Sequence, residues 1–123
     1  MIAAAQLNDI ADRLFAAFVA HDLEVVEAML TANALITQNG ITSPVADALT
    51  NIAAIRHVIG DHRYEDVRRV VGDNAIVEEH QVRSTTPGGS PVDLAACVVV
   101  RVNDDGLITS LDEYVDISTF PQS

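Results

Sequence analysis

The sequence predicts a single α+β domain over residues 1–123, in which helices cover one face of an antiparallel sheet. The length of 123 residues suits one domain, and an apolar fraction of 49% is sufficient for a packed core. The first half of the chain has apolar residues at helical spacing, whereas the second half has long strand-like runs between short turns. Helices that precede such a run of strands are typical of an α+β layer.

The first two helices are predicted from periodicity and from one capping residue. Apolar side chains recur at helical spacing between Leu7 and Val19 and form one stripe. Asp22 is a suitable N-cap for a second helix over residues 23–30. Because only His21 and Asp22 separate the two helices, we expect them to form an elbow.

A short strand and a third helix follow. Residues 34–38 form a short β-branched run that predicts a strand. The third helix is predicted from Pro44 to about Ile59, with Ser43 as its cap and Pro44 at the first helical position. Gly60 can end this helix in the left-handed conformation.

Four longer strands are predicted for the rest of the chain. They are residues 64–71, 75–85, 92–103 and 107–119. The turns between them are short and rich in Gly, Asp, Asn and Pro, which predicts an antiparallel meander.

The net charge of the chain limits the classes of partner that it can bind. It has 18 acidic residues, 7 basic residues and a formal net charge of −11. Such a surface repels nucleic acid and anionic membranes, so we expect an apolar, neutral or cationic small molecule as the ligand. The single cysteine, Cys97, allows no intramolecular disulfide and fits a reducing compartment. With no apolar run of membrane-spanning length, the expected location is the cytoplasm.

The most specific pattern lies near the C-terminus. Residues 98–109 combine an apolar strand, an acidic turn with glycine and an Ile-Thr pair, and Tyr114-Val115-Asp116 follows. In this pattern and in its element order the chain resembles the nuclear transport factor 2-like superfamily. It is most similar to the branch of the limonene-epoxide hydrolases and SnoaL-like polyketide cyclases. The resemblance implies a strongly curved sheet that forms a cone around an internal pocket, and a homodimer formed through the outer face of the sheet.

The resemblance also implies candidate site residues. Asp116 matches the aspartate that activates water in the epoxide hydrolases, and Asn39 matches an asparagine that holds this water. Residues 112, 114 and 116 share one face of the predicted strand, so Tyr114 would offer a hydroxyl group beside Asp116 if that face lines the cone. The structural alternatives are a solvated strand-end aspartate, a turn asparagine before Gly40 and a rim aromatic.

Glu78 and His80 depart from the epoxide hydrolases, which carry an arginine and an aspartate at these positions. Both residues share one face of the strand predicted over residues 75–85. We therefore expect an Asp116–His80–Glu78 relay in which His80 carries the proton and Glu78 tunes it. The structural alternative is a histidine that is hydrogen-bonded to a cross-strand neighbour.

Three functions stay open, none of which needs a cofactor or a metal ion. The first is hydrolysis of an epoxide-like apolar substrate with Asp116 as the base. The second is cyclisation or isomerisation of the SnoaL type, which also uses an acidic residue in the last strands. The third is a non-catalytic module that binds an apolar ligand or dimerises through outward residues such as Val99, Arg101 and Val115. Steroid-type isomerisation is disfavoured, because Gln38 or Asn39 replaces the early-loop aspartate.

Overall fold

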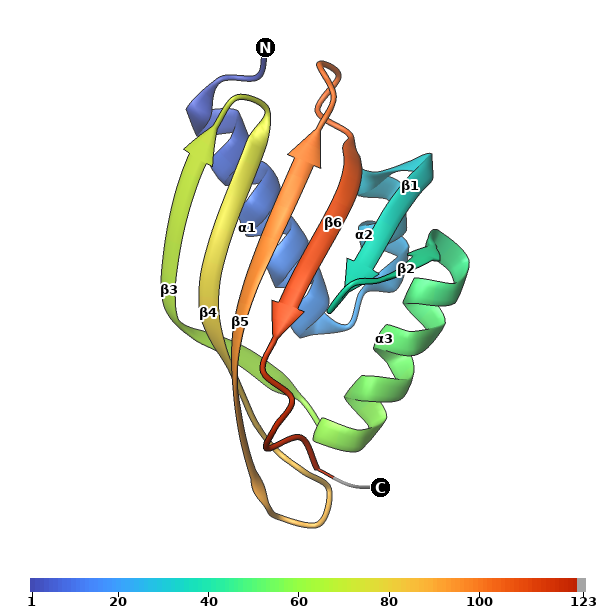
Figure 1. Cartoon of the computed structure of the whole chain (residues 1–123), viewed down its shortest axis with the longest axis vertical. Helices are drawn as coiled ribbons and strands as arrows, with labels where there is room; N and C mark the ends of the chain where they lie inside the picture. Colours follow the sequence, from blue (N-terminus) through green and yellow to red (C-terminus); the bar gives the residue numbers. More distant parts are fainter. Residues whose placement is uncertain (122–123) are drawn as a thin grey trace.

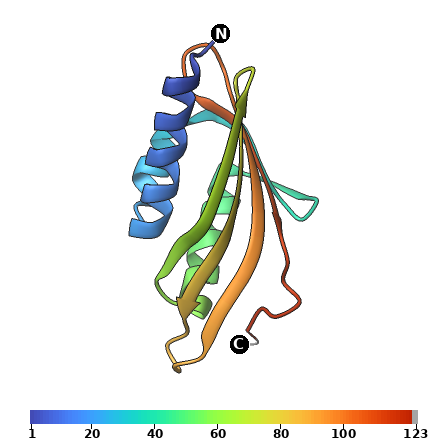
Figure 2. The ribbon, with the colours of Figure 1, turned by 90° about the vertical axis from the view of Figure 1, so that its left-hand side faces the viewer.

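The computed structural model describes residues 1–121, which form three helices and one six-stranded sheet (Figure 1). In chain order the elements are α1 (Ala4–Ala20), α2 (Leu23–Met29), β1 (Leu30–Gln38), β2 (Ile41–Pro44), α3 (Val45–Ile59), β3 (His62–Gly72), β4 (Ala75–Thr85), β5 (Pro91–Val102) and β6 (Ile108–Val115). The helices lie on one side of a curved, unclosed sheet (Figure 2). The predicted α+β class is confirmed.

The sheet has the strand order β2-β1-β6-β5-β4-β3. The predicted meander is confirmed for β3 to β6, which pair antiparallel with their sequence neighbours. The sheet is nevertheless mixed, because β1 pairs with β6 in parallel. Since α3 carries the chain from β2 to the far edge of the sheet, the meander returns and places β6 beside β1 (Figure 1). The short strand β2 was not predicted.

The main core lies between α1 and the concave face of the sheet. Helix α1 buries Leu7 and Leu14, and the sheet contributes Ile76, Val100 and Ile108, all at most 1% exposed. The inward residues of β4 and β5 alternate strictly with exposed or half-buried ones, as the period of two requires. A smaller apolar cluster surrounds the end of α3. The cavity described below opens between these two clusters.

Of the three predicted helix ends, the cap at Asp22 is correct, the cap at Ser43 is wrong, and Gly60 is correct in position only. Asp22 caps α2, because its Oδ1 accepts a hydrogen bond from the Val25 N–H at 3.3 Å. Ser43 does not cap α3; it belongs to β2, and α3 starts at Val45 without a side-chain cap. Gly60 ends α3 with φ 80° and ψ −171°, an extended conformation with positive φ rather than the expected left-handed one.

The last strand is shorter than predicted and ends at Val115. The Asp116 N–H still donates to the Ala95 carbonyl at 2.9 Å, but the chain then leaves the sheet. A turn closed by the Phe120 N–H and the Ile117 carbonyl (3.0 Å) folds the tail back, and Phe120 packs on the smaller apolar cluster. The tail therefore closes one side of the cavity instead of extending the sheet. Within residues 1–121, no helix is long and apolar enough to span a membrane.

Candidate functional site

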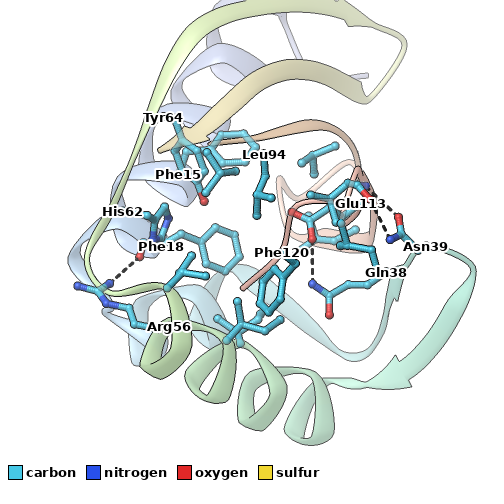
Figure 3. Close-up of a pocket in the computed structure, with 18 of the residues that line it drawn as sticks. Phe15, Phe18, Gln38, Asn39, Arg56, His62, Tyr64, Leu94, Glu113 and Phe120 are labelled. Carbon is cyan, nitrogen blue, oxygen red and sulfur yellow. Dashed lines mark hydrogen bonds between the residues drawn. The ribbon is translucent and has the colours of Figure 1, made fainter. Parts of the chain in front are cut away.

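A cavity of about 240 Å³ lies between the concave face of the sheet, the helices α1 and α3, and the C-terminal tail. Its walls are mostly aliphatic, with Val82, Leu94 and Val98 from the sheet facing Ile52 and Ile55 from α3. Four of the five aromatic residues of the chain also line it: Phe15, Phe18, Tyr64 and Phe120. Polar side chains enter this apolar space at opposite walls (Figure 3).

The first polar group of the cavity is centred on Glu113 from β6. Gln38 at the end of β1 donates a hydrogen bond from Nε2 to Glu113 Oε1 at 2.8 Å. The pairing of β1 with β6 in register (Gln38 beside Glu113) fixes this contact. Glu113 Oε2 accepts no hydrogen bond from residues 1–121, and the carboxylate points toward the open space (Figure 3). Glu113 is the one carboxylate among the described lining residues.

The second polar group is His62 and Tyr64, two residues apart on β3. Burial, with the positive charge of Arg56 as the next cause, lowers the pKa of His62 to about 4, so its imidazole is neutral near neutral pH. Its Nδ1 is buried and has no hydrogen-bond partner in the described part of the chain. Burial raises the pKa of the Tyr64 hydroxyl far above its usual value, and Glu113 adds to this effect. Tyr64 therefore stays a neutral phenol that can donate a hydrogen bond.

Arg56 of α3 lines the cavity, but its guanidinium is already occupied. Its Nη1 donates to the carbonyls of Phe18 (3.2 Å) and Val19 (3.0 Å) at the C-terminal end of α1. Its Nη2 binds Asp61 Oδ1 at 2.8 Å. A cation suits this end of a helix, where the carbonyl groups point outward. Arg56 thus joins α1 to α3 and closes the cavity beside His62 (Figure 3).

Two predicted site residues, Asp116 and Tyr114, lie outside the cavity. Tyr114 is 56% exposed and pairs with Cys97 on the outer face of the sheet. Asp116 is exposed beyond the strand end, and the Ser118 N–H that donates to its Oδ1 at 2.9 Å lowers the pKa of its carboxyl. The physical reason is register: β6 pairs Glu113 with the inward Val98, so residues 111, 113 and 115 face inward. The expected outward position of Val115 is wrong for the same reason.

Asn39 lies at the rim of the cavity, and both ends of its amide bind backbone. Its Nδ2 donates to the Val115 carbonyl at 3.0 Å, and its Oδ1 accepts from the Val115 N–H at 2.9 Å. Asn39 also has φ 47°, a left-handed conformation that asparagine tolerates. This geometry is that of a turn residue that joins β1 to β6.

Glu78 and His80 face inward together, as predicted, but behind the cavity wall. They are 1% and 2% exposed, and His80 Nδ1 lies 2.7 Å from Glu78 Oε2. His80 does not line the cavity; its ring stacks on the ring of Tyr64 with 4.1 Å between centroids. The expected relay is wrong in its first member, because Asp116 is on the surface while Arg69 contacts Glu78 at 2.8 Å.

The SnoaL-like domain family matches residues 11–111, which is most of the chain. The chain belongs to the SnoaL-like domain family. No curated protein gives a significant match.

Solved structures similar to this SnoaL-like domain share its fold at low identity. A candidate polyketide cyclase from Xanthomonas campestris is 16% identical, with 94% of each chain covered and a TM-score of 0.82. AclR, a candidate hydroxylase from Streptomyces galilaeus, is 14% identical over 94% of this chain and 82% of its own, with a TM-score of 0.85. A candidate SnoaL-like polyketide cyclase from Shewanella putrefaciens is 10% identical over 93% and 82%, with a TM-score of 0.81. The predicted superfamily is confirmed, and these comparisons favour its SnoaL-like branch over the epoxide hydrolases.

Four polar residues of this SnoaL-like domain were missed by the sequence reasoning: Gln38 as a partner of the carboxylate, His62, Tyr64 and Glu113. A signal for Glu113 was present, because Leu111 and Val115 flank it at a spacing of two and are apolar. The prediction followed the match of Asp116 to the family aspartate instead, which places the opposite face of the strand toward the cavity. For His62 and Tyr64 the strand pattern carried no comparable signal.

Proposed function

We propose that this SnoaL-like domain catalyses a cofactor-free proton transfer on an apolar small molecule, of the isomerase or cyclase type, with Glu113 as the general base. The observation that supports it is the Glu113 carboxylate, with one oxygen held by Gln38 and the other free in an apolar cavity. A carboxylate oxygen that is free of hydrogen bonds inside an apolar cavity can accept a proton from a carbon acid that binds beside it. The similarity to polyketide cyclases supports the same reaction type.

The proposed reaction needs only groups of this chain. Glu113 removes a proton from a carbon next to a carbonyl group, and the electron pair of the C–H bond forms an enolate. Tyr64 and the neutral His62 stabilise the enolate oxygen by donating hydrogen bonds from the opposite wall (Figure 3). Glu113 then returns the proton to another carbon, which is an isomerisation. In a cyclisation, the enolate carbon attacks a second carbonyl of the same molecule and the new alkoxide takes the proton.

The base can be tested with 5-nitrobenzisoxazole, whose ring opens when a base removes its carbon-bound proton. The N–O bond breaks, and the electron pair leaves on oxygen as a coloured phenolate, so absorbance follows the rate. We expect Glu113→Gln to lower the rate by about 100-fold or more, a usual contribution of a general base. Asp112→Asn on the outer face is the matched control, and Asp116→Asn tests the aspartate that the sequence predicted. Loss of rate in Asp116→Asn with Glu113→Gln unchanged would contradict the proposal.

A second experiment separates catalysis from simple binding of an apolar ligand. Cyclohexenone is incubated with the protein in D₂O, and NMR follows the replacement of its acidic C–H protons by deuterium. Turnover predicts exchange that is faster with the wild-type protein than with Glu113→Gln. Binding to the cavity without exchange would support the non-catalytic module, which the aliphatic walls suit equally well.

Two further proposals concern the cellular location of the protein and the polarity of its substrate. We propose that the protein works in the cytoplasm, on the grounds of its single, half-buried Cys97. We further propose an apolar or neutral substrate, because the cavity walls carry few polar groups. Fractionation of the source cells would place the protein, and recovery in a periplasmic or secreted fraction would contradict the first point.

A further inference from the structure

A buried charged network lies behind the cavity, and the proposed reaction does not use it directly. Arg69 on β3 donates from Nη1 to Asp12 Oδ1 at 2.8 Å and to Asn8 Oδ1 at 3.2 Å. Its Nε and Nη2 bind Glu78 Oε1 at 2.9 Å and 2.8 Å. Glu78 Oε2 contacts His80 Nδ1 at 2.7 Å. The network therefore runs from the surface of α1 to the interior of the sheet.

Stability alone is a weak explanation of such a network. Glu78 and His80 are 1% and 2% exposed, and the side chain of Arg69 is 18% exposed. Removing charged groups from water is costly, and well-packed apolar residues in place of a buried ion pair are often equally stable. A role beyond stability must therefore be sought at the end of the network that meets the cavity.

At that end the network meets Tyr64. The rings of His80 and Tyr64 have centroids 4.1 Å apart and an interplanar angle of 30°. Phe15 stands edge-on to both rings, at 5.3 Å from His80 and 5.5 Å from Tyr64. The ring of His62 also packs against that of Tyr64, with 4.9 Å between centroids and 68° between planes. Tyr64 and Phe15 line the cavity whereas His80 does not, and of these two neighbours of His80 Tyr64 carries the polar group that can bind a ligand.

The hydrogen bond to Glu78 determines that Nδ1 of His80 carries a proton, and it also orients the imidazole ring. A carboxylate that already accepts from Arg69 can only accept from His80, so Nδ1 of His80 carries a proton. This charge-assisted bond sets the plane of the imidazole ring, and Glu78 in turn is held by two donors of the guanidinium. The imidazole held in this way packs against the Tyr64 ring at a tilt of 30° and so limits the positions that this ring, with its hydroxyl group, can take.

We propose that Arg69, Glu78 and His80 are positioning residues that fix the ring of Tyr64 and aim its hydroxyl group at the ligand in the cavity. The catalytic consequence rests on the function proposed above, in which Tyr64 donates to the developing oxyanion. The orientation of Tyr64 does not depend on that function and can be measured by itself.

The first measurement follows the ring directly by ¹⁹F NMR. In a Tyr114→Phe background labelled with 3,5-difluorotyrosine, Tyr64 is the single labelled residue, because the chain has two tyrosines. A fixed ring holds its two fluorines in different surroundings that give separate lines, whereas a freely flipping ring gives one averaged line. We expect separate lines in this background and one averaged line after Glu78→Gln. Glu79→Gln, the outward neighbour on the same strand, is the matched control and should keep separate lines.

The second measurement is a double-mutant cycle on the ring opening of 5-nitrobenzisoxazole. We expect Tyr64→Phe and Glu78→Gln each to lower kcat by about tenfold with little change in KM, and the double variant to be no slower than Tyr64→Phe. Additive losses would mean that Glu78 acts on the fold and would overturn the proposal, as would separate ¹⁹F lines in Glu78→Gln.

Two further controls distinguish failure of the proposed function from failure of the positioning role. If Glu113→Gln keeps the full rate, the proposed function fails, but the ¹⁹F lines still test the positioning role. If Glu78→Gln does not fold, Asp12→Asn weakens the network from its exposed end, with Asp9→Asn on the same helix as its control. Unchanged lines in a folded Asp12→Asn variant would then overturn the proposal.

Discussion

At the scale of single residues, His62 is a buried histidine whose surroundings lower its pKa. Its pKa falls from 6.5 to about 4, first because of burial and then because of the positive charge of Arg56. His80, Asp61 and His21 have smaller effects, with Asp61 opposing the others. A histidine that is neutral in the folded state but protonated in the unfolded state favours unfolding in acid.

This shift predicts how stability depends on pH. Because the folded pKa lies below the unfolded value, the contribution of His62 is fully present above about pH 6.5 and is lost as the pH falls toward 4. Urea unfolding across this window should therefore give a free energy that falls less steeply in His62→Gln than in the wild-type protein. His57→Gln on the exposed side of α3 should keep the wild-type slope. Equal slopes for all three proteins would refute the assignment.

The carboxylate of the site shows what sequence reasoning can and cannot supply at this scale. An acidic residue in the last strand was predicted to act as the base, and the structure offers Glu113 in place of Asp116. A shift of one residue exchanges the two faces of a strand, so a family match that is uncertain by one position cannot choose between them. The apolar neighbours Leu111 and Val115 carry the better signal, because they must face the core.

At the scale of elements, the junction between α3 and β3 sets the depth of the cavity. Ser84 on β4 donates a hydrogen bond from Oγ to the Ile59 carbonyl at 2.7 Å, which anchors the end of α3 to the sheet. The next residue, Gly60, packs so closely on β4 that a Cβ atom would collide with the Thr85 carbonyl oxygen. Since Ile52 and Ile55 of α3 line the cavity, a shift of this junction moves one of its walls.

Substitution of Gly60 tests this junction. Gly60→Ala combines an unfavourable positive φ of 80° with the collision at Thr85, whereas Gly40→Ala has a similar φ of 85° and open space around it. The conformation of Gly60, with φ 80° and ψ −171°, is one that essentially only glycine adopts and costs another residue about 1–3 kcal/mol by itself. We expect Gly60→Ala to lose at least about 1 kcal/mol more than Gly40→Ala in urea unfolding, as steric overpacking usually does. Equal losses in the two variants would show that the junction relaxes freely.

The periodic patterns of the sequence predicted most helices and strands within a few residues. Each feature that they missed has a physical explanation. Ala75–Thr85 was predicted at both ends because turns flank it on each side. The strand Ile41–Pro44 was missed because four residues are too few to show alternation. The parallel pairing of β1 and β6 depends on the path of the whole chain, which no local pattern records.

At the scale of the whole molecule, one face of the sheet is left without helices (Figure 2). On this face Leu35, Val70 and Tyr114 are 53%, 70% and 56% exposed. The charges nearby are paired within the chain, as in Arg101 with Asp112, so the face is less repulsive than a net charge of −11 suggests. A sheet face that no helix covers and that exposes large apolar side chains is a candidate interaction site.

We therefore predict that two copies associate through this outer face, as the resemblance first implied. Tyr114→Glu should shift the protein from dimer to monomer in light scattering, because a two-fold axis near the strand places two new negative charges close together. Val25→Glu adds the same charge at an exposed apolar residue on α2, and this variant should remain dimeric. A wild-type protein that stays monomeric at high concentration would contradict the prediction. Dimerisation would also cover β6 from outside, and the resulting rigidity would hold Glu113 on the opposite face of the same strand toward the cavity.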